Sequence, residues 1–202
     1  MSGKLDVANE ALYLAFCPTI EDLTDMTREA EAVRLRYETV YQRHAASYHW
    51  DFCRTMALLQ GPVLLADGVT VDEPPARWAF RYPFPTDPPV LAVNAILVED
   101  KPIDYGIFGQ QVLTDADARD VEIVMDYLWR APEETWPPFF RSTFVMMLGS
   151  DLAGGVREDI ERSAQLKNDA LAELRTARFT SAKQRPSRRL AIGRLSRLRV
   201  AR

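Results

Sequence analysis

The sequence has few of the residues on which covalent, redox or metal chemistry depends. Only two cysteines, Cys17 and Cys53, and two histidines, His44 and His49, occur in its 202 residues. The cysteines lie far apart and match no metal or redox spacing, so we expect two buried or half-buried thiols. The histidines are five residues apart on an expected helix, so they do not share a face and form a poor metal pair. We expect structural roles for all four.

Motifs that would identify an enzyme are also missing. The sequence has no glycine-rich phosphate loop, no G-x-S-x-G turn and no H-E-x-x-H helix. Asp115, Asp117 and Asp120 crowd one expected loop, but a calcium loop would require glycine where Asp120 stands. Capping and solvation explain these carboxylates better. We therefore predict a protein that is not an enzyme, with no catalytic residues, no metal and no cofactor.

Long apolar runs are absent as well. No stretch approaches the roughly 18 apolar residues of a membrane span, and the first residues, Met1 to Asp6, are polar. We accordingly expect synthesis in the cytoplasm and no membrane association. With 47% hydrophobic and 27% charged residues, the composition is otherwise that of an ordinary folded protein.

Charge is distributed unevenly along the chain. From Arg175 onward there are ten basic residues and no aspartate or glutamate. The first 174 residues hold the other 15 of the 25 basic residues and all 29 acidic ones, so their net charge is −14. An acidic body with a basic end is informative about partners rather than about the fold.

The spacing of apolar residues predicts helices at both ends of the chain. Residues 5–16 form the first, and Thr27 should cap a longer one that continues toward Phe52. The apolar face of this longer helix comprises Ala30, Val33, Tyr37 and Val40/Tyr41. After Trp136-Pro137-Pro138, residues 139–152 should form a largely buried helix that Gly154-Gly155 ends. Residues 156–179 form a more polar helix, and its apolar stripe comprises Ile160, Ala164, Leu171 and Leu174.

The middle of the chain predicts strands. Residues 77–82 have strand period, and residues 90–98 are nearly all apolar, as in a strand buried on both faces. Residues 103–113, around Gly106 and Gly109, should form a strand pair or a bent strand. Residues 121–129 alternate as in an amphipathic strand.

This order of elements predicts an α+β fold. We expect a helical bundle from the N- and C-terminal helices, with an inserted antiparallel β domain and an extended basic C-terminal tail. The expected divisions are residues 1–52 and 136–180 for the bundle, 53–135 for the β domain and 181–202 for the basic arm.

The basic arm has the strongest functional indication in the chain. We expect it to contact a protein partner, DNA or both through Lys183, Arg185, Arg188, Arg189, Arg194, Arg197, Arg199 and Arg202. Uncompensated positive charge binds polyanions by releasing counterions. Leucine, isoleucine and valine between the arginines favour docking on protein as well. A solvated terminus and a membrane-surface helix are the alternatives.

Four motifs follow one another along the body of the chain. They are His49-Trp50-Asp51-Phe52, Tyr82-Pro83-Phe84-Pro85-Thr86-Asp87, Leu113-Thr114-Asp115 and Trp136-Pro137-Pro138-Phe139-Phe140. In this order and spacing they resemble the tail tubular protein A family, the head–tail adaptors or gatekeepers of short-tailed bacteriophages. The structural residues that carry the resemblance are Trp50, Phe52, Tyr82, Pro83, Pro85, Asp87, Leu113, Thr114, Asp115, Trp136 and Phe139. Pro88-Pro89 and the strongly basic arm depart from the family pattern.

The resemblance implies a virion structural protein without catalysis. Members of the family form a ring of about twelve copies between the portal and the tail nozzle, around the channel through which DNA passes. For this chain it implies self-association, contacts with a portal and with a nozzle or other tail protein, and DNA in the channel without sequence specificity. It also implies a location in the neck of the virion after synthesis in the host cytoplasm.

Two other functions remain open. A neck or head-completion protein of a longer-tailed phage would act in the same way with a different neighbour. A cellular DNA-binding protein with a basic arm is more distant, because no helix-turn-helix or basic recognition helix is visible.

Overall fold

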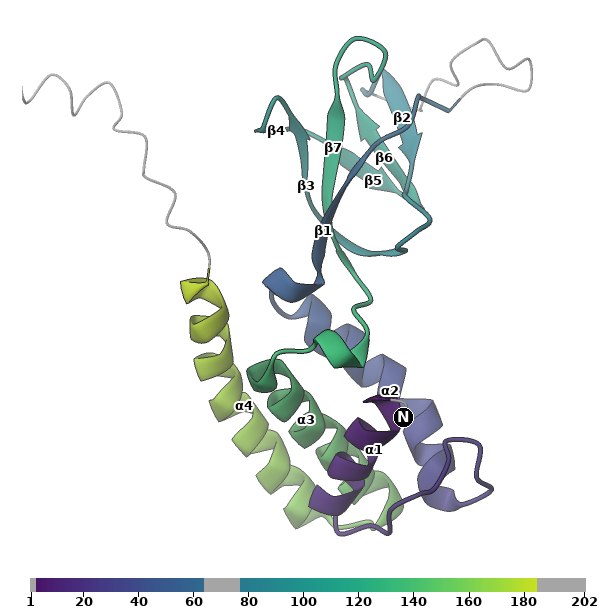
Figure 1. Ribbon diagram of the computed structural model, residues 1–202, viewed down its shortest axis with the longest axis vertical. Coiled ribbons are helices and arrows are strands. Elements are labelled where there is room, and N and C mark those ends of the chain that lie inside the picture. Colours follow the sequence, from purple (N-terminus) through teal and green to yellow (C-terminus); the bar gives the residue numbers. More distant parts are fainter. Residues whose placement is uncertain (1–2, 64–76, 185–202) are drawn as a thin grey trace, which may run out of the picture.

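The computed structural model describes residues 3–63 and 77–184, which divide between a helical bundle and a β domain (Figure 1). Helices from the two ends of the chain pack together, and the strands lie between them in sequence. The predicted α+β class with an inserted antiparallel β domain is therefore confirmed. The β domain stands at one end of the bundle (Figure 1).

α3 is the central helix of the bundle. The four helices are α1 (Gly3–Leu14), α2 (Arg28–Ala46), α3 (Pro138–Val156) and α4 (Ile160–Lys183), and α3 packs against each of the others. As predicted, Thr27 caps α2 by accepting a hydrogen bond from Ala30 N, and Pro138 lies in the first turn of α3. α1 ends two residues earlier than expected, and the chain turns away at Phe16, which has a φ of 56°.

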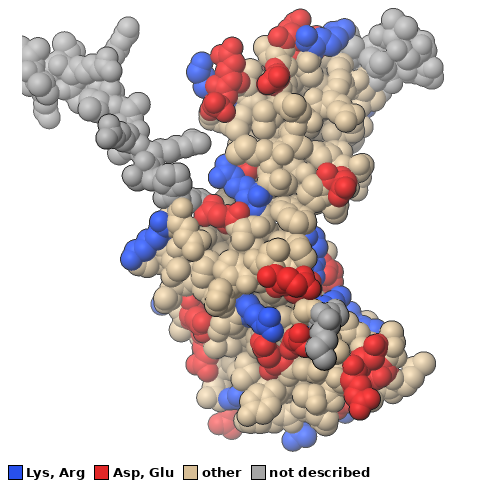
Figure 2. Space-filling model, in the orientation of Figure 1, with Lys and Arg blue, Asp and Glu red and all other residues tan. Residues whose placement is uncertain are grey.

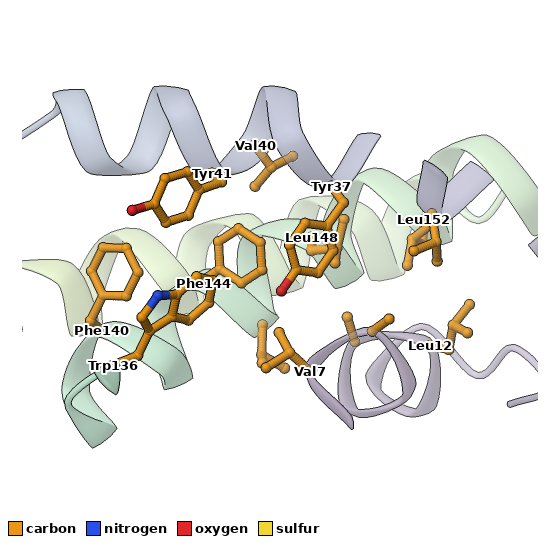
Figure 3. Packing of buried hydrophobic residues seen from close by; sticks show 14 of the residues in the cluster. Val7, Leu12, Tyr37, Val40, Tyr41, Trp136, Phe140, Phe144, Leu148 and Leu152 are labelled. Atoms are coloured by element: carbon orange, nitrogen blue, oxygen red, sulfur yellow. The ribbon is translucent and has the colours of Figure 1, made fainter. Parts of the chain in front are cut away.

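The main hydrophobic core lies between α1, α2 and α3, and aromatic rings fill much of it (Figure 3). The predicted face of α2 points inward, and its residues Ala30, Val33, Tyr37, Val40 and Tyr41 are fully buried. Tyr37 meets Phe144 of α3 edge-on, with ring centroids 5.1 Å apart. Each large side chain buried here contributes about 1.5–3 kcal/mol, so this core accounts for much of the stability of the bundle.

The prediction that Gly154-Gly155 ends α3 was wrong. The helix continues through both glycines to Val156, and the break falls at residues 157–159, where Glu158 has a φ of 57°. A Cβ atom on Gly154 would lie 3.3 Å from Ser163 Oγ of α4. Gly154 therefore permits close packing between two helices rather than a turn.

Of the predicted apolar stripe of α4, only Leu174 is buried, and the other three residues were wrongly placed. The buried residues are Leu166, Ala170, Leu174, Ala177 and Ser181, while Ile160 and Leu171 are 81% and 47% exposed and Ala164 is exposed too. α4 turns its small residues toward α3 because they allow the two backbones to approach closely. The helix also extends past residue 180, so Lys183 belongs to its last turn and not to an extended arm.

The β domain consists of two small antiparallel sheets. The strand order is β1-β7-β3-β4 in one sheet and β2-β6-β5 in the other. Their bounds are β1 (Arg54–Leu58), β2 (Phe80–Pro83), β3 (Val90–Val98), β4 (Lys101–Ile103), β5 (Gly106–Phe108), β6 (Gln111–Thr114) and β7 (Ile123–Trp129). The expected strand pair is confirmed as β5 and β6, with Gly109 in the turn at a φ of 59°.

β3 has the predicted bounds but not the predicted burial on both faces. Only Ile96 is fully buried, and the other residues of the strand are half-buried. The inner face packs on the second sheet through Ile96 and Met125. On the outer face of the same sheet, Met56 and Leu58 are 55% and 59% exposed. β3 thus belongs to a sheet with one covered face, and not to a sheet buried on both faces as predicted.

Candidate functional site

The bundle and the β domain are joined by an aromatic cluster, which we call the junction. It comprises Tyr41, Trp50, Phe52, Trp136, Phe139 and Phe140. Tyr41 stacks on Trp136 with centroids 5.3 Å apart, and Phe52 meets Phe140 at 4.6 Å. Trp50 is fully buried and donates from Nε1 to the His44 carbonyl at 3.2 Å. Four of the motif residues, Trp50, Phe52, Trp136 and Phe139, therefore meet where the chain passes between its two parts.

Arg130 secures the return of the chain from the β domain to the bundle. Its guanidinium lies 4.0 Å from the centroid of the Tyr41 ring and donates to Glu133 at 2.6 Å. Tyr37 donates to the same carboxylate at 3.1 Å. Burial raises the pKa of Glu133, but the hydrogen bond and charge of Arg130 outweigh it and hold that pKa below its usual range. This network engages Arg130, Glu133 and Tyr37 with one another and fixes the junction.

The other motif residues lie in the β domain, away from the junction. Fully buried Tyr82 donates to the Ala116 carbonyl at 2.8 Å and accepts from Ala118 N at 2.9 Å, which fixes the loop after β6. Leu113 and Thr114 are buried in β6, Pro83 ends β2, and Pro85 and Asp87 occupy the following turn. The structure thus places the eleven motif residues in two separate groups, and both groups hold the fold.

The loop carboxylates cap and pair locally. Asp115 accepts from Ala79 N at 3.1 Å. Asp117 accepts from the backbone and side chain of Arg119, and these hydrogen bonds lower its pKa. Capping is therefore confirmed for these two residues. Within residues 3–63 and 77–184, no group of three His, Cys, Asp or Glu side chains could hold a metal ion.

His44 and both cysteines are packing residues, as expected. Cys17 and Cys53 are buried free thiols, and burial raises the pKa of Cys53 to about 12. His44 is 1% exposed and stacks on Phe140 with centroids 4.5 Å apart. Burial lowers its pKa to about 4, so the ring is neutral near pH 7. His49 is exposed beside the junction.

A groove with a volume of about 460 Å³ lies between α2 and α4, and residues of α3 also line it. We call it the α2/α4 groove. It is lined by Arg43, His44, Ser47, Met147, Ser150, Asp151, Ser163, Lys167, Leu171, Leu174 and Arg178. Arg43, Lys167 and Arg178 supply three positive charges against the single carboxylate of Asp151, which lies 3.7 Å from Arg43. Arg178 donates to the Ser47 carbonyl at 3.1 Å, which anchors α4 beside the end of α2.

Two buried nitrogen atoms at this groove lack a hydrogen-bond partner among the residues described here. They are His44 Nδ1 and Arg178 Nε. An unsatisfied buried donor costs about 1–3 kcal/mol, and because both atoms are buried they are closed to acceptors from outside the chain.

A second, shallower hollow lies between α1 and α3. Its α1 side presents Asp6, Glu10 and Tyr13, which we call the α1 face. Tyr13 is 74% exposed, and Glu10 accepts from Arg141 of α3 at 2.6 Å. Figure 2 shows acidic and basic side chains interspersed over the bundle, on the side where α1 is nearer the viewer than α2.

The basic arm can be located only at its start. Lys183 lies in the last turn of α4. The remaining residues of the predicted arm lie outside the described residues, and they are Arg185, Arg188, Arg189, Arg194, Arg197, Arg199 and Arg202.

The two helical surfaces are what sequence reasoning missed. A signal for one was present, because Lys167, Leu171 and Arg178 are spaced by four and seven residues and therefore share a helix face. Leu171 was instead assigned to the buried stripe.

Comparison with protein-family models finds no match, and comparison with curated proteins finds none either. In the described part of the chain, no helix combines the length and the apolar character needed to cross a membrane. Functional inference therefore depends on the residues and their geometry. These residues form a two-part body with charged grooves and exposed apolar side chains.

Proposed function

We propose that the protein is a virion structural subunit, a head–tail adaptor that forms a ring between the portal and the tail of a bacteriophage. The ring would contain about twelve copies and surround the channel through which DNA passes. In this proposal the protein has no catalytic role. Its partners are further copies of itself, a portal protein, and a nozzle or other tail protein.

The junction is the observation that carries the proposal. An adaptor must hold a bundle and a β domain at a fixed angle, because each end meets a different neighbour. Four of the eleven motif residues, among them Trp50 and Trp136, join the two parts. The charged side chains beside them, Arg130 and Glu133, are engaged in holding that joint.

Exposed apolar side chains at several points of the body give further support. Ile107 and Phe108 on the β5–β6 hairpin are 52% and 67% exposed, and Met56 and Leu58 lie open on the outer face of a sheet. Apolar side chains grouped on a surface commonly mark contacts with other proteins. A ring subunit needs such contacts on both sides and at both ends.

Electron microscopy of the purified protein with portal rings from the same phage tests the proposal. We expect a second ring stacked on the portal along its axis, with the copy number read from top views. A salt-sensitive shift of DNA without any ring would instead favour a DNA-binding protein. If neither portal binding nor ring formation occurs, the adaptor proposal is wrong. A ring that recruits the neck protein of a longer tail would identify the alternative phage type.

A further inference from the structure

We propose that neighbouring copies meet through the α1 face of one copy and the α2/α4 groove of the next. This inference rests on the ring proposed above and names the two surfaces that the ring would join. It commits both surfaces to a second copy of this chain.

The placement of the two surfaces fits a closed ring. Arg141 and Ser142 of α3 lie beside the α1 face, and Ser150 and Asp151, nine positions later in each case, line the groove. Nine residues make about two and a half helical turns, so the surfaces open on opposite sides of α3. Head-to-tail contacts in a ring of about twelve copies require surfaces about 150° apart, whereas a twofold dimer would use one surface twice.

The charges on the two surfaces are complementary. Asp6, Glu10 and Tyr13 are spaced by four and three residues and form one row along α1. Lys167, Leu171 and Arg178 form one row along α4, and Arg43 of α2 faces them across the groove. Glu10 is already paired with Arg141, and Arg43 with Asp151, so the new contacts would be made chiefly by Asp6 of one copy and by Lys167 and Arg178 of the next. Such complementarity fixes the register of a contact and suppresses wrong pairings.

Tyr13 is suited to anchor the contact. Its ring is 74% exposed in the isolated chain, although tyrosine is a large amphipathic side chain that usually covers apolar surface. The groove has an apolar floor of Met147, Leu171 and Leu174, and its volume of about 460 Å³ can hold one aromatic side chain. The tyrosine hydroxyl would lie among Arg43, Lys167 and Arg178, whose side chains line the groove and can donate hydrogen bonds to it. Tyrosines in central pockets are typical anchors of protein interfaces.

Crosslinking with a short bismaleimide distinguishes this contact from others. Tyr13→Cys and Leu171→Cys introduce exposed thiols, whereas the native Cys17 and Cys53 are buried and give the background reaction in the unchanged protein. Each single variant alone should give no crosslink, and a mixture of the two should give dimers only. A chain carrying both changes should give a ladder up to the size of the ring. The reaction is run on the full chain, free and bound to portals.

A charge exchange provides an independent readout. Asp6→Lys and Lys167→Glu should each weaken ring assembly about tenfold, and a chain with both should recover most of it. Asp169→Lys alters an exposed carboxylate on another face of α4 and serves as the matched control.

A failure of the two named surfaces can be told apart from a failure of the adaptor proposal. Rings that form without these crosslinks, or crosslinks from Tyr13→Cys alone, would overturn the named surfaces and leave the adaptor proposal intact. If no ring forms on portals even for the unchanged chain, both proposals fall.

Discussion

His44 should make the stability of the bundle depend on pH. Its ring is 1% exposed, stacks on Phe140 and lies 2.9 Å from Thr143 Oγ1 through Nε2. Burial, with smaller contributions from Arg178 and Arg43, lowers its pKa to about 4. In an unfolded chain the pKa of histidine is about 6.5.

The size of the effect follows from these two values. Because the folded-state pKa is the lower one, the unfolded chain binds more protons between about pH 4 and pH 6.5. The free energy of unfolding therefore falls as the pH drops through this window. For one group with these pKa values, the loss between about pH 7.5 and about pH 5 is about 2 kcal/mol.

Urea unfolding followed by circular dichroism at several pH values measures this loss. His44→Phe fills the same space without titrating, and Thr143 keeps its bonds to backbone carbonyls of α3. The unfolding free energy of the unchanged protein minus that of this variant should fall by about 2 kcal/mol between about pH 7.5 and about pH 5. His49→Gln removes the other histidine of the chain and serves as the comparison that identifies a loss specific to His44. A constant difference across the pH range would refute the reasoning.

Three further predictions concern packing, charge pairing and the arm. Gly149→Ala places a Cβ atom 3.1 Å from a backbone carbonyl of α1 and should lower the unfolding free energy by about 1–3 kcal/mol. Gly155→Ala meets nothing within 4 Å and should raise the unfolding free energy by up to about 1 kcal/mol. The urea midpoints of the two variants test this contrast. Asp126 Oδ1 accepts from Arg54 Nε at 2.7 Å, so Arg54→Met leaves a buried carboxylate without its partner and should lower the unfolding free energy by about 3 kcal/mol. Adding Asp126→Leu should restore most of this stability. Equal losses for the single and the double variant would contradict the pairing. Deleting residues 185–202 should abolish portal attachment or salt-sensitive DNA binding while circular dichroism stays unchanged, and survival of both activities would exclude a binding role for the arm.

Local sequence patterns predicted the elements that are determined by residues close together in the sequence. α2 follows its apolar spacing because one face meets the core and the other meets solvent. β3 runs over the expected residues because Pro88-Pro89 precedes it and a turn at Glu99 and Asp100, both with positive φ, follows it. Such boundaries depend on residues that are adjacent in sequence, so the sequence alone is enough to predict them.

Packing between helices escaped prediction because it depends on distance as well as polarity. α4 buries Ala170 and Ala177 and exposes Ile160, since close approach to α3 stabilises the pair more than burial of one isoleucine. Glycines in α3 have the same role, and Gly154 was therefore misread as a helix end. The α2/α4 groove combines residues of α2 with residues of α3 and α4, which come much later in the chain, so no local pattern contains the whole groove.

The helical end of α4 changes how the charge asymmetry is interpreted. Three of the ten basic residues from Arg175 onward, namely Arg175, Arg178 and Lys183, are part of a folded helix. Arg178 is bound to the Ser47 carbonyl near the junction, so α4 ends at the same end of the bundle as the β domain (Figure 1). The positive charge from Arg175 onward is thus divided between the end of a folded helix and the predicted arm, and the last turn of that helix lies at the end of the bundle that carries the β domain.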